Sequence, residues 1–254
     1  MNLTVIPLTA KKKSKKFSFY DELKRILDNN KFVIKNGDVL VISSKFIANS
    51  QGRILEIKDS VVSDKAKEIA GKFNTDQNFM EIVLRESDKI FGGVSGFVMS
   101  TTNGILAPNA GIDRSNSDGT KIILYPNEPF NFAEELRRKI FLKFNVHVGI
   151  IIVDSRLMPG RVGTTGITIG CAGISPTRDL RGEKDLDGNP LKVTFQATAD
   201  NLAAIANHEM GEGADLHPIT IVRDSDCELT DRRVKQEEMV IPHEQCVYIR
   251  SFST

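Results

Sequence analysis

Acidic side chains beside small residues are the groups in this sequence whose types and spacing could do chemistry. Asp154 follows residues 150–153, a run of Ile and Val only, which is typical of a strand buried on both faces. Ser155 comes next, then a segment rich in Gly, Thr and Arg that includes Arg161. Glycines let backbone N–H groups approach a ligand, and arginines bind phosphate oxygens in pairs. The pattern predicts a site for a metal ion and phosphates at a strand end, with a plain polar loop as the equally weighted alternative.

Two further acids occur in similar settings. Asp113 lies in residues 107–116, a segment rich in Asn, Gly and Pro that predicts either an ordinary turn or a rigid loop presenting Asp113 to a hard cation. Glu212 stands between two glycines after a predicted helix, where a glycine is commonly just the C-cap. Three carboxylates with a hydroxyl and arginines are suited to bind Mg²⁺ or Mn²⁺ on nucleotide phosphates. Asp113, Asp154 and Glu212 are therefore the candidate catalytic residues.

Three other polar segments carry weaker signals. Ser44 and Lys45 follow the predicted strand 38–43 and could bind phosphate, although the pattern is short. The basic run 11–16 predicts a solvated loop, with neutralisation of ligand phosphates as the alternative. Residues 185–188 contain Asp-x-Asp-Gly without the remaining ligands of an EF-hand, so we expect a charged excursion closed by a turn.

Composition excludes several classes of protein. The chain has 34 Lys plus Arg against 33 Asp plus Glu, a balance that argues against a dedicated nucleic-acid binder. Three widely spaced cysteines form no CxxC pair, and the four histidines are scattered singly, so neither a disulfide framework nor a structural zinc site is indicated. No apolar run approaches the roughly 20 residues that span a bilayer. We expect a cytoplasmic protein without nucleic-acid or membrane partners.

The elements that must position the candidate residues follow from apolar periodicity and turn signals. Strands are predicted at residues 3–7, 38–43, 150–153, 191–197 and 218–222. Helices are predicted at residues 20–29, 65–73, 76–87, 131–145 and 200–210, the second and third of them capped by Ser63 and Thr75. Asn103-Gly104 predicts a two-residue hairpin turn between strands 97–101 and 104–106.

Five motifs, in order along the chain, resemble those of the coenzyme F420:γ-glutamyl ligase family. They are NAGIDRSN at 109–116, the strand end at 150–155, the Gly-rich segment 161–173, RGEKDLDG at 181–188 and MGEG at 210–213. The resemblance extends over about residues 38–222. It implies an α+β fold with mixed, mainly antiparallel sheets and flanking helices, in an intertwined homodimer. Since no linker marks a boundary, residues 1–254 are expected to form a single domain, which could contain two intertwined subdomains.

The resemblance also implies an activity, that of a coenzyme F420-0:L-glutamate ligase. Such an enzyme uses GTP and two divalent cations, Mg²⁺ or Mn²⁺, to add L-glutamate to coenzyme F420-0 through an acyl phosphate; K⁺ is a further candidate ion. By this resemblance Asp113 and Asp154 bind one cation, and Ser155 with Glu212 binds the second. The residues implied to line the nucleotide are Ser44, Lys45, Asn116, Met210, Gly211, Gly213, Ala214, Asp215, Leu216 and His217.

The sequence departs from the family pattern in its nucleotide-contacting parts. An N-terminal Gly-Leu-Pro segment is missing, Asn49 stands where a lysine is expected, and Met158 replaces a frequent arginine. The lysines from Lys11 onward could supply the lost charge. Two alternatives to the ligase of F420-0 are a paralogous ligase for a different carboxylate or amine, and a non-catalytic protein that binds nucleotide or metal.

Overall fold

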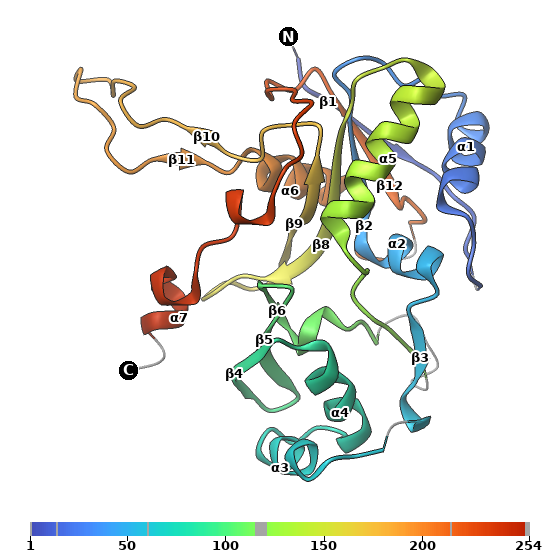
Figure 1. Ribbon diagram of the computed structural model, residues 1–254, viewed down its shortest axis with the longest axis vertical. Coiled ribbons are helices and arrows are strands. Elements are labelled where there is room, and N and C mark those ends of the chain that lie inside the picture. The colour runs from blue at the N-terminus through green and yellow to red at the C-terminus, as the bar shows by residue number, and fades with distance from the viewer. Residues whose placement is uncertain (1, 14, 60, 115–120, 214, 252–254) are drawn as a thin grey trace. The chain divides into compact units, whose positions relative to one another are not determined.

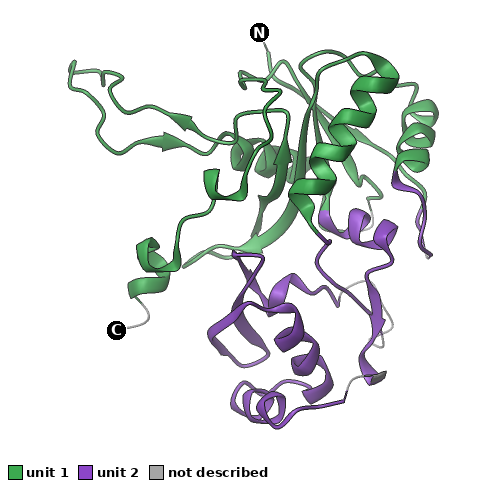
Figure 2. Cartoon of the chain, viewed as in Figure 1, with its two compact units in different colours: residues 1–11, 20–43, 128–254 green, residues 12–19, 44–127 purple. Residues whose placement is uncertain are grey.

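The polypeptide forms two compact units, each described here by itself. The computed structural model describes residues 2–13, 15–59, 61–114, 121–213 and 215–251. Unit 1 consists of residues 1–11, 20–43 and 128–254, and unit 2 of residues 12–19 and 44–127 (Figure 2). Both ends of the chain therefore belong to unit 1, and two inner stretches build unit 2. No helix in the described part of the chain is long and apolar enough to cross a membrane.

Unit 1 is built on a five-stranded sheet with the order β1-β12-β2-β8-β9. Its strands are β1 Thr4–Leu8, β12 Ile219–Arg223, β2 Val39–Ser43, β8 Gly149–Leu157 and β9 Thr164–Ala172. Only β2 and β8 pair in parallel, and the other neighbours are antiparallel. The apolar runs at the starts of β2 and β8 are completely buried, as expected for central strands covered on both faces. The prediction of mixed, mainly antiparallel sheets is confirmed.

Helices α5 (Pro129–Phe144) and α6 (Thr198–Met210) cover opposite faces of this sheet (Figure 1). Two glycines of β9 allow them to approach. A Cβ added to Gly166 would lie 2.6 Å from the Ala203 carbonyl oxygen on α6, and one added to Gly170 would lie 2.7 Å from the Pro129 backbone on α5. The sequence suggested that glycines here serve ligand binding, and for Gly166 the structure shows a packing role.

Replacing Gly166 by Ala is expected to destabilise the protein by about 1–3 kcal/mol, because the new methyl group meets the backbone of α6. Chemical denaturation measures this change. Gly71→Ala is the matched control, since Gly71 lies in helix α3 (Asp64–Lys72) with nothing within 4 Å of an added Cβ. That variant should be more stable by about 0.5–1 kcal/mol. A Gly166→Ala protein as stable as the wild type would contradict the packing role.

Two strand predictions in unit 1 were wrong. The strand predicted to end at Val153 continues as β8 to Leu157, because Asp154–Leu157 pairs with residues 164–167 of β9. This half of the strand leaves the core, so the apolar pattern stops while the backbone ladder continues. The strand predicted at 191–197 shrinks to β11 (Phe195–Gln196), paired with β10 (Arg178–Asp179) in a projecting arm (Figure 1). Its apolar side chains Val193 and Phe195 are exposed, so no core extends the pairing.

The remaining elements of unit 1 follow their sequence signals. Helix α1 spans Phe19–Asn29, and the Asp187-Gly188 turn closes the arm, with the Asp185 carboxylate accepting from the Asn189 N–H at 2.8 Å. Beyond β12 the chain is largely irregular, with the short segments η3 (Gln236–Glu238), η4 (His243–Gln245) and α7 (Val247–Ser251).

Unit 2 holds a three-stranded and a two-stranded sheet, both antiparallel. Its elements are α2 Ser44–Gln51, β3 Ile54–Glu56, η1 Ile57–Asp59, α3, α4 Gln77–Glu86, β4 Lys89–Val94, β5 Phe97–Thr102, β6 Ile105–Pro108, η2 Asn109–Gly111 and β7 Lys121–Ile123. Asn103 and Gly104 join β5 to β6 with φ of 51° and 71°, as a two-residue hairpin turn requires.

The helix caps of unit 2 test the local predictions. Ser63 caps α3, since its hydroxyl accepts a hydrogen bond from the Ala66 N–H at 3.2 Å, as predicted. The cap of α4 is Asp76, whose carboxylate accepts from the Phe79 N–H at 2.8 Å, so the assignment to Thr75 was wrong by one residue. Helix α2 was not predicted, because it is short and buried on several sides and therefore lacks a clear polar face.

Candidate functional site

Asp154 and Ser155 project from opposite faces of the sheet in unit 1. Across the β8–β9 ladder, Asp154 is opposite Ile167 and Ser155 is opposite Gly166. Directly opposed residues share a face, and Gly166 faces α6, so Ser155 lies on the α6 side and Asp154 on the other. Asp154 is partly buried and Ser155 is exposed. Two adjacent oxygen donors are thus presented on two different sides of one strand.

Glu212 is held on the α6 side by two hydrogen bonds. The Thr164 hydroxyl and the Asn207 side-chain amide both donate to its Oε1, each at 3.0 Å. The other oxygen, Oε2, has no partner among the described residues. Gly211 caps α6 with its N–H on the Asn207 carbonyl at 3.2 Å. Sequence reasoning missed Thr164 and Asn207, although Asn207 lies one helical turn before the glycine that marks the helix end.

The segment after α6 rests against the ends of β1 and β2. The Leu216 carbonyl accepts from the Ala10 N–H at 2.8 Å, and the Pro218 carbonyl accepts from the Ser43 N–H at 2.9 Å. Leu216 has φ of 57°, a conformation uncommon for a bulky residue. Tertiary contacts therefore fix the backbone of this predicted nucleotide segment.

The side chains of that segment differ in what they could contact. Met210 packs in the α6-side core, so only its backbone is available to a ligand. Asp215 is exposed, and so are Gly211 and Gly213. The ring Nδ1 of His217 is buried and lacks a hydrogen-bond partner in the described part of the chain, a situation that favours an external partner. Ala214 lies outside the described residues.

In unit 2, Asp113 forms an ion pair with Lys45 at the start of α2. The Asp113 backbone is tied to β7, its N–H donating to the Ile123 carbonyl at 2.9 Å and its carbonyl accepting from the Ile123 N–H at 3.0 Å. The structure thus brings together two residues predicted to serve different ligands, a cation and a nucleotide. Ser44, beside Lys45, is buried.

The loop before Asp113 is conformationally constrained. Asn109, Ala110 and Gly111 have φ of 49°, 57° and 69°, a run of left-handed residues that persists only where surrounding contacts hold it. The Asn109 side chain accepts from the Val98 N–H at 2.9 Å, and a Cβ on Gly111 would collide with the Tyr125 ring. These contacts favour the rigid loop over the ordinary turn.

Two predicted nucleotide-binding residues remain. Arg161 lies exposed in the turn between β8 and β9, where its backbone N–H donates to the Met158 carbonyl at 3.2 Å. Asn116 lies outside the described residues. Lysines 11, 12, 15 and 16 are exposed, and Lys13 lies over the Phe17 ring at 5.7 Å.

The predicted cation ligands have the chemistry that Mg²⁺ and Mn²⁺ require. All four carry oxygen donors, and Glu212 keeps one oxygen open while two hydrogen bonds orient the other. No three His, Cys, Asp or Glu side chains gather into a ready-made metal cluster within the residues that the structure describes. Asp113 belongs to unit 2, and Asp154, Ser155 and Glu212 belong to unit 1.

Comparison with known proteins gives consistent matches. The sequence model described as F420-0:Gamma-glutamyl ligase matches residues 14–224. The Coenzyme F420:L-glutamate ligase of Archaeoglobus fulgidus is 36% identical over 203 residues, which cover 80% of this chain and 81% of that protein. The protein of the same name from Methanocaldococcus jannaschii is 34% identical over 219 residues, covering 85% and 86%. That of Natronomonas pharaonis is 37% identical over 211 residues, covering 80% of each.

These matches define an enzyme of the ligase class. The chain belongs to the F420-0:gamma-glutamyl ligase family. The resemblance seen in the five motifs is confirmed, and with it the prediction of a ligase. The matched range 14–224 extends beyond the motifs at its N-terminal end and includes the second half of the basic run, residues 14–16.

Proposed function

We propose that this protein adds L-glutamate to coenzyme F420-0 in a GTP-dependent reaction that releases GDP and phosphate. The observation that carries the proposal is the family match over residues 14–224, which includes every predicted cation ligand. The relatives named above bear the name Coenzyme F420:L-glutamate ligase and match this chain over most of their length.

The reaction needs two displacements. A carboxylate oxygen of F420-0 attacks the γ-phosphorus of GTP, the bond from that phosphorus to the bridging oxygen breaks, and GDP leaves. The amine nitrogen of L-glutamate then attacks the acyl carbon, the bond to the phosphate oxygen breaks, and the nitrogen loses its proton. Neither step uses a protein nucleophile, which agrees with a sequence that shows no Ser/His/Asp or Cys/His signature.

The chain's own residues supply charge and orientation. Asp113 and Asp154 are assigned to one divalent cation, and Ser155 and Glu212 to the second. When bound, these cations would neutralise phosphate charge and polarise the transferring group. Two observations support this assignment of ligands to two separate cations. Asp154 and Ser155 lie on opposite faces of the sheet, and two hydrogen bonds orient Glu212.

Other residues are assigned to the nucleotide. Lys45 and Arg161 are proposed to bind phosphate oxygens, Lys45 exchanging its contact with Asp113 for one with the nucleotide. His217 is proposed to direct its buried Nδ1 to the ligand. Ser44, Asn116 and the segment from Met210 to His217 complete the set that the family resemblance implies.

Two finer points rest on the family resemblance alone. We propose an intertwined homodimer, which sedimentation equilibrium would distinguish from a monomer. We also propose that K⁺ supports activity, which replacement of K⁺ by Na⁺ in the assay would test.

The decisive experiment is phosphate release from GTP with Mn²⁺, with and without F420-0 and L-glutamate, followed by the mass of the product. Release that requires both substrates and adds one or more glutamyl units to F420-0 is the expected result. Release only with another carboxylate or amine would identify a paralogous ligase. Nucleotide binding without release under any of these conditions would identify a non-catalytic member of the family.

A further inference from the structure

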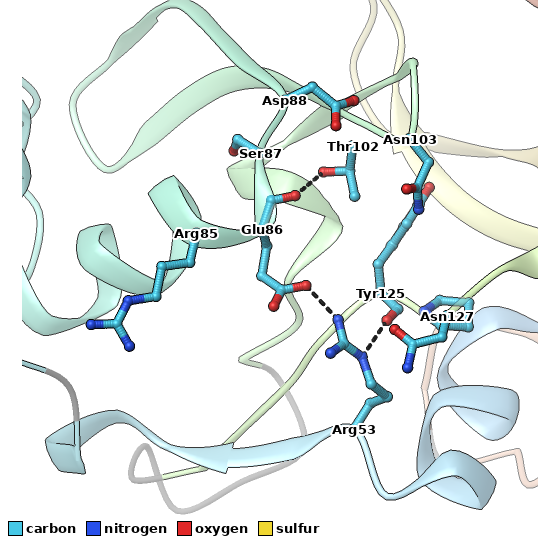
Figure 3. Close-up of a pocket in the computed structure, with 10 residues that line it drawn as sticks. Arg53, Arg85, Glu86, Ser87, Asp88, Thr102, Asn103, Tyr125 and Asn127 are labelled. Carbon is cyan, nitrogen blue, oxygen red and sulfur yellow. Dashed lines mark hydrogen bonds and ion pairs between the residues drawn. The ribbon is translucent and has the colours of Figure 1, made fainter.

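Unit 2 contains a polar pocket that shares no residue with the predicted cation and nucleotide ligands. Its volume is about 230 Å³, and four stretches of chain enclose it (Figure 3). They are Arg53 after α2, residues 85–88 at the end of α4, residues 102–103 at the hairpin turn, and residues 125–127. The lining is almost entirely polar, which excludes an apolar ligand and is suited to a small charged molecule.

Arg53 presents unused hydrogen-bond donors to this pocket. Its Nε donates to the Tyr125 carbonyl at 3.0 Å, and its NH2 group forms an ion pair with Glu86 (Figure 3). A guanidinium has five N–H donors in a planar fork. The donors that these two contacts leave over have no partner among the described residues. Arg53 is therefore fixed in position and still able to bind a carboxylate.

Asp88 lines the same pocket at a distance from Arg53 (Figure 3). Its carboxylate offers a negatively charged hydrogen-bond acceptor, opposite in charge to the Arg53 guanidinium. Its Oδ2 accepts from the Gly104 N–H at 2.7 Å. Within the described part of the chain Oδ1 has no partner. Like Arg53, Asp88 is oriented by the protein and keeps one charged atom for a ligand.

The balance of charge selects the class of ligand. Two arginines and two acids line the pocket. The acids would repel the phosphates of a nucleotide, and Arg53 would repel a metal cation. A molecule with both a carboxylate and an ammonium group would meet complementary charge at Arg53 and at Asp88. The pocket is thus matched to a free amino acid.

The residues that line the pocket also contact the loop that carries Asp113. The Tyr125 ring abuts Gly111, two residues before Asp113. The Arg53 carbonyl accepts from the Leu124 N–H at 2.9 Å, which ties the Arg53 segment to the strand that pairs with Asp113. A ligand bound here would lie in the same unit as the acid assigned to cation binding.

We infer that this pocket binds the amino-acid substrate, L-glutamate, with a carboxylate on Arg53 and the ammonium group on Asp88. The inference rests on the proposed function for the identity of the amino acid. Its physical basis is the match between the two charges of an amino acid and the oriented charges of Arg53 and Asp88. Binding by this match does not depend on whether the enzyme turns over.

Equilibrium dialysis of radiolabelled L-glutamate with the full chain, in Mg²⁺ and a non-hydrolysable GTP analogue, tests the inference. Arg53→Gln and Asp88→Asn should each weaken binding by about 10- to 100-fold, since each removes a charged hydrogen bond. Arg85→Gln is the matched control. The Arg85 guanidinium points away from Arg53 (Figure 3) and donates to Glu81 at 2.9 Å and to the Val61 carbonyl at 3.2 Å. Its loss should leave binding unchanged.

Analogues test the two charges separately. Glutarate lacks the ammonium group and L-glutamine lacks one carboxylate, so both should compete more weakly than L-glutamate. Asp88→Asn keeps an oxygen for the Gly104 N–H, so this variant decides the matter if Arg53→Gln does not fold. Wild-type affinity in Asp88→Asn, or glutarate binding as tightly as L-glutamate, would overturn the inference.

The outcomes also separate this inference from the proposed function. If Asp88→Asn adds glutamate to F420-0 with an unchanged KM for L-glutamate, the proposed function is supported and binding of L-glutamate in this pocket is refuted. Binding of L-glutamate that depends on Arg53 and Asp88, without glutamylation by the wild type, would sustain the pocket and refute the function. Absence of L-glutamate binding by the wild type would refute the pocket.

Discussion

Asp154→Asn is expected to lower phosphate release from GTP by at least about 100-fold, with the fold unchanged. Loss of an outer partner of a metal ligand already costs about 10- to 100-fold, and Asp154 is proposed as a ligand itself. The amide keeps the size of the side chain but removes the charge that attracts a cation. Because Asp154 lies where β8 leaves the core, the substitution creates no buried cavity. Initial rates of phosphate release measure the effect.

Glu209→Gln is the control for the loss of one negative charge. Glu209 is exposed on the last turn of α6, close in sequence to Glu212, and lies outside the proposed site. We expect wild-type rates from this variant. Mn²⁺ binding, followed by electron paramagnetic resonance, should weaken in Asp154→Asn and in Glu212→Gln and not in Glu209→Gln. Unchanged Mn²⁺ affinity and turnover in Asp154→Asn would remove Asp154 from the site.

Arg223→Met is expected to destabilise the protein by about 3–5 kcal/mol, the cost of leaving a buried charge without its partner. Asp38 is completely buried, and its two oxygens accept from Arg223 Nε and NH2, each at 2.7 Å. Its Oδ2 also accepts from the Lys35 N–H at 2.8 Å. The hydrogen bonds to Asp38 raise the pKa of Arg223, so the guanidinium stays charged. Urea denaturation measures the loss.

An exposed pair of similar geometry provides the control. Arg181 forms forked hydrogen bonds with Asp179, at 2.9 Å and 2.6 Å, and these hold the pKa of Asp179 at about 2. Water solvates both groups when the pair is broken, so Arg181→Met should leave stability unchanged. Adding Asp38→Asn to Arg223→Met should recover part of the loss, because the uncompensated charge disappears. No recovery in the double variant would show that packing of the Arg223 side chain, and not charge, carries the effect.

The sequence determined the features that depend on neighbours along the chain. Helix α5, the Asn103-Gly104 turn and the Ser63 cap follow from apolar spacing, from backbone freedom and from a hydroxyl near free N–H groups. The five motifs also identified the family, because their residue types and their order can be read from the sequence without knowledge of the fold.

Only the tertiary structure decided where the polar half of β8 lies. This half pairs with β9 through its backbone while its side chains reach solvent, so the sequence shows no apolar pattern there. The tertiary structure gave Gly166 a packing role that depends on a helix some forty residues away in sequence. It also joined Lys45 to Asp113 and placed Thr164 and Asn207 on Glu212. These contacts link segments far apart in the sequence. Local propensity carries no information about such partners, which the packing of the core selects.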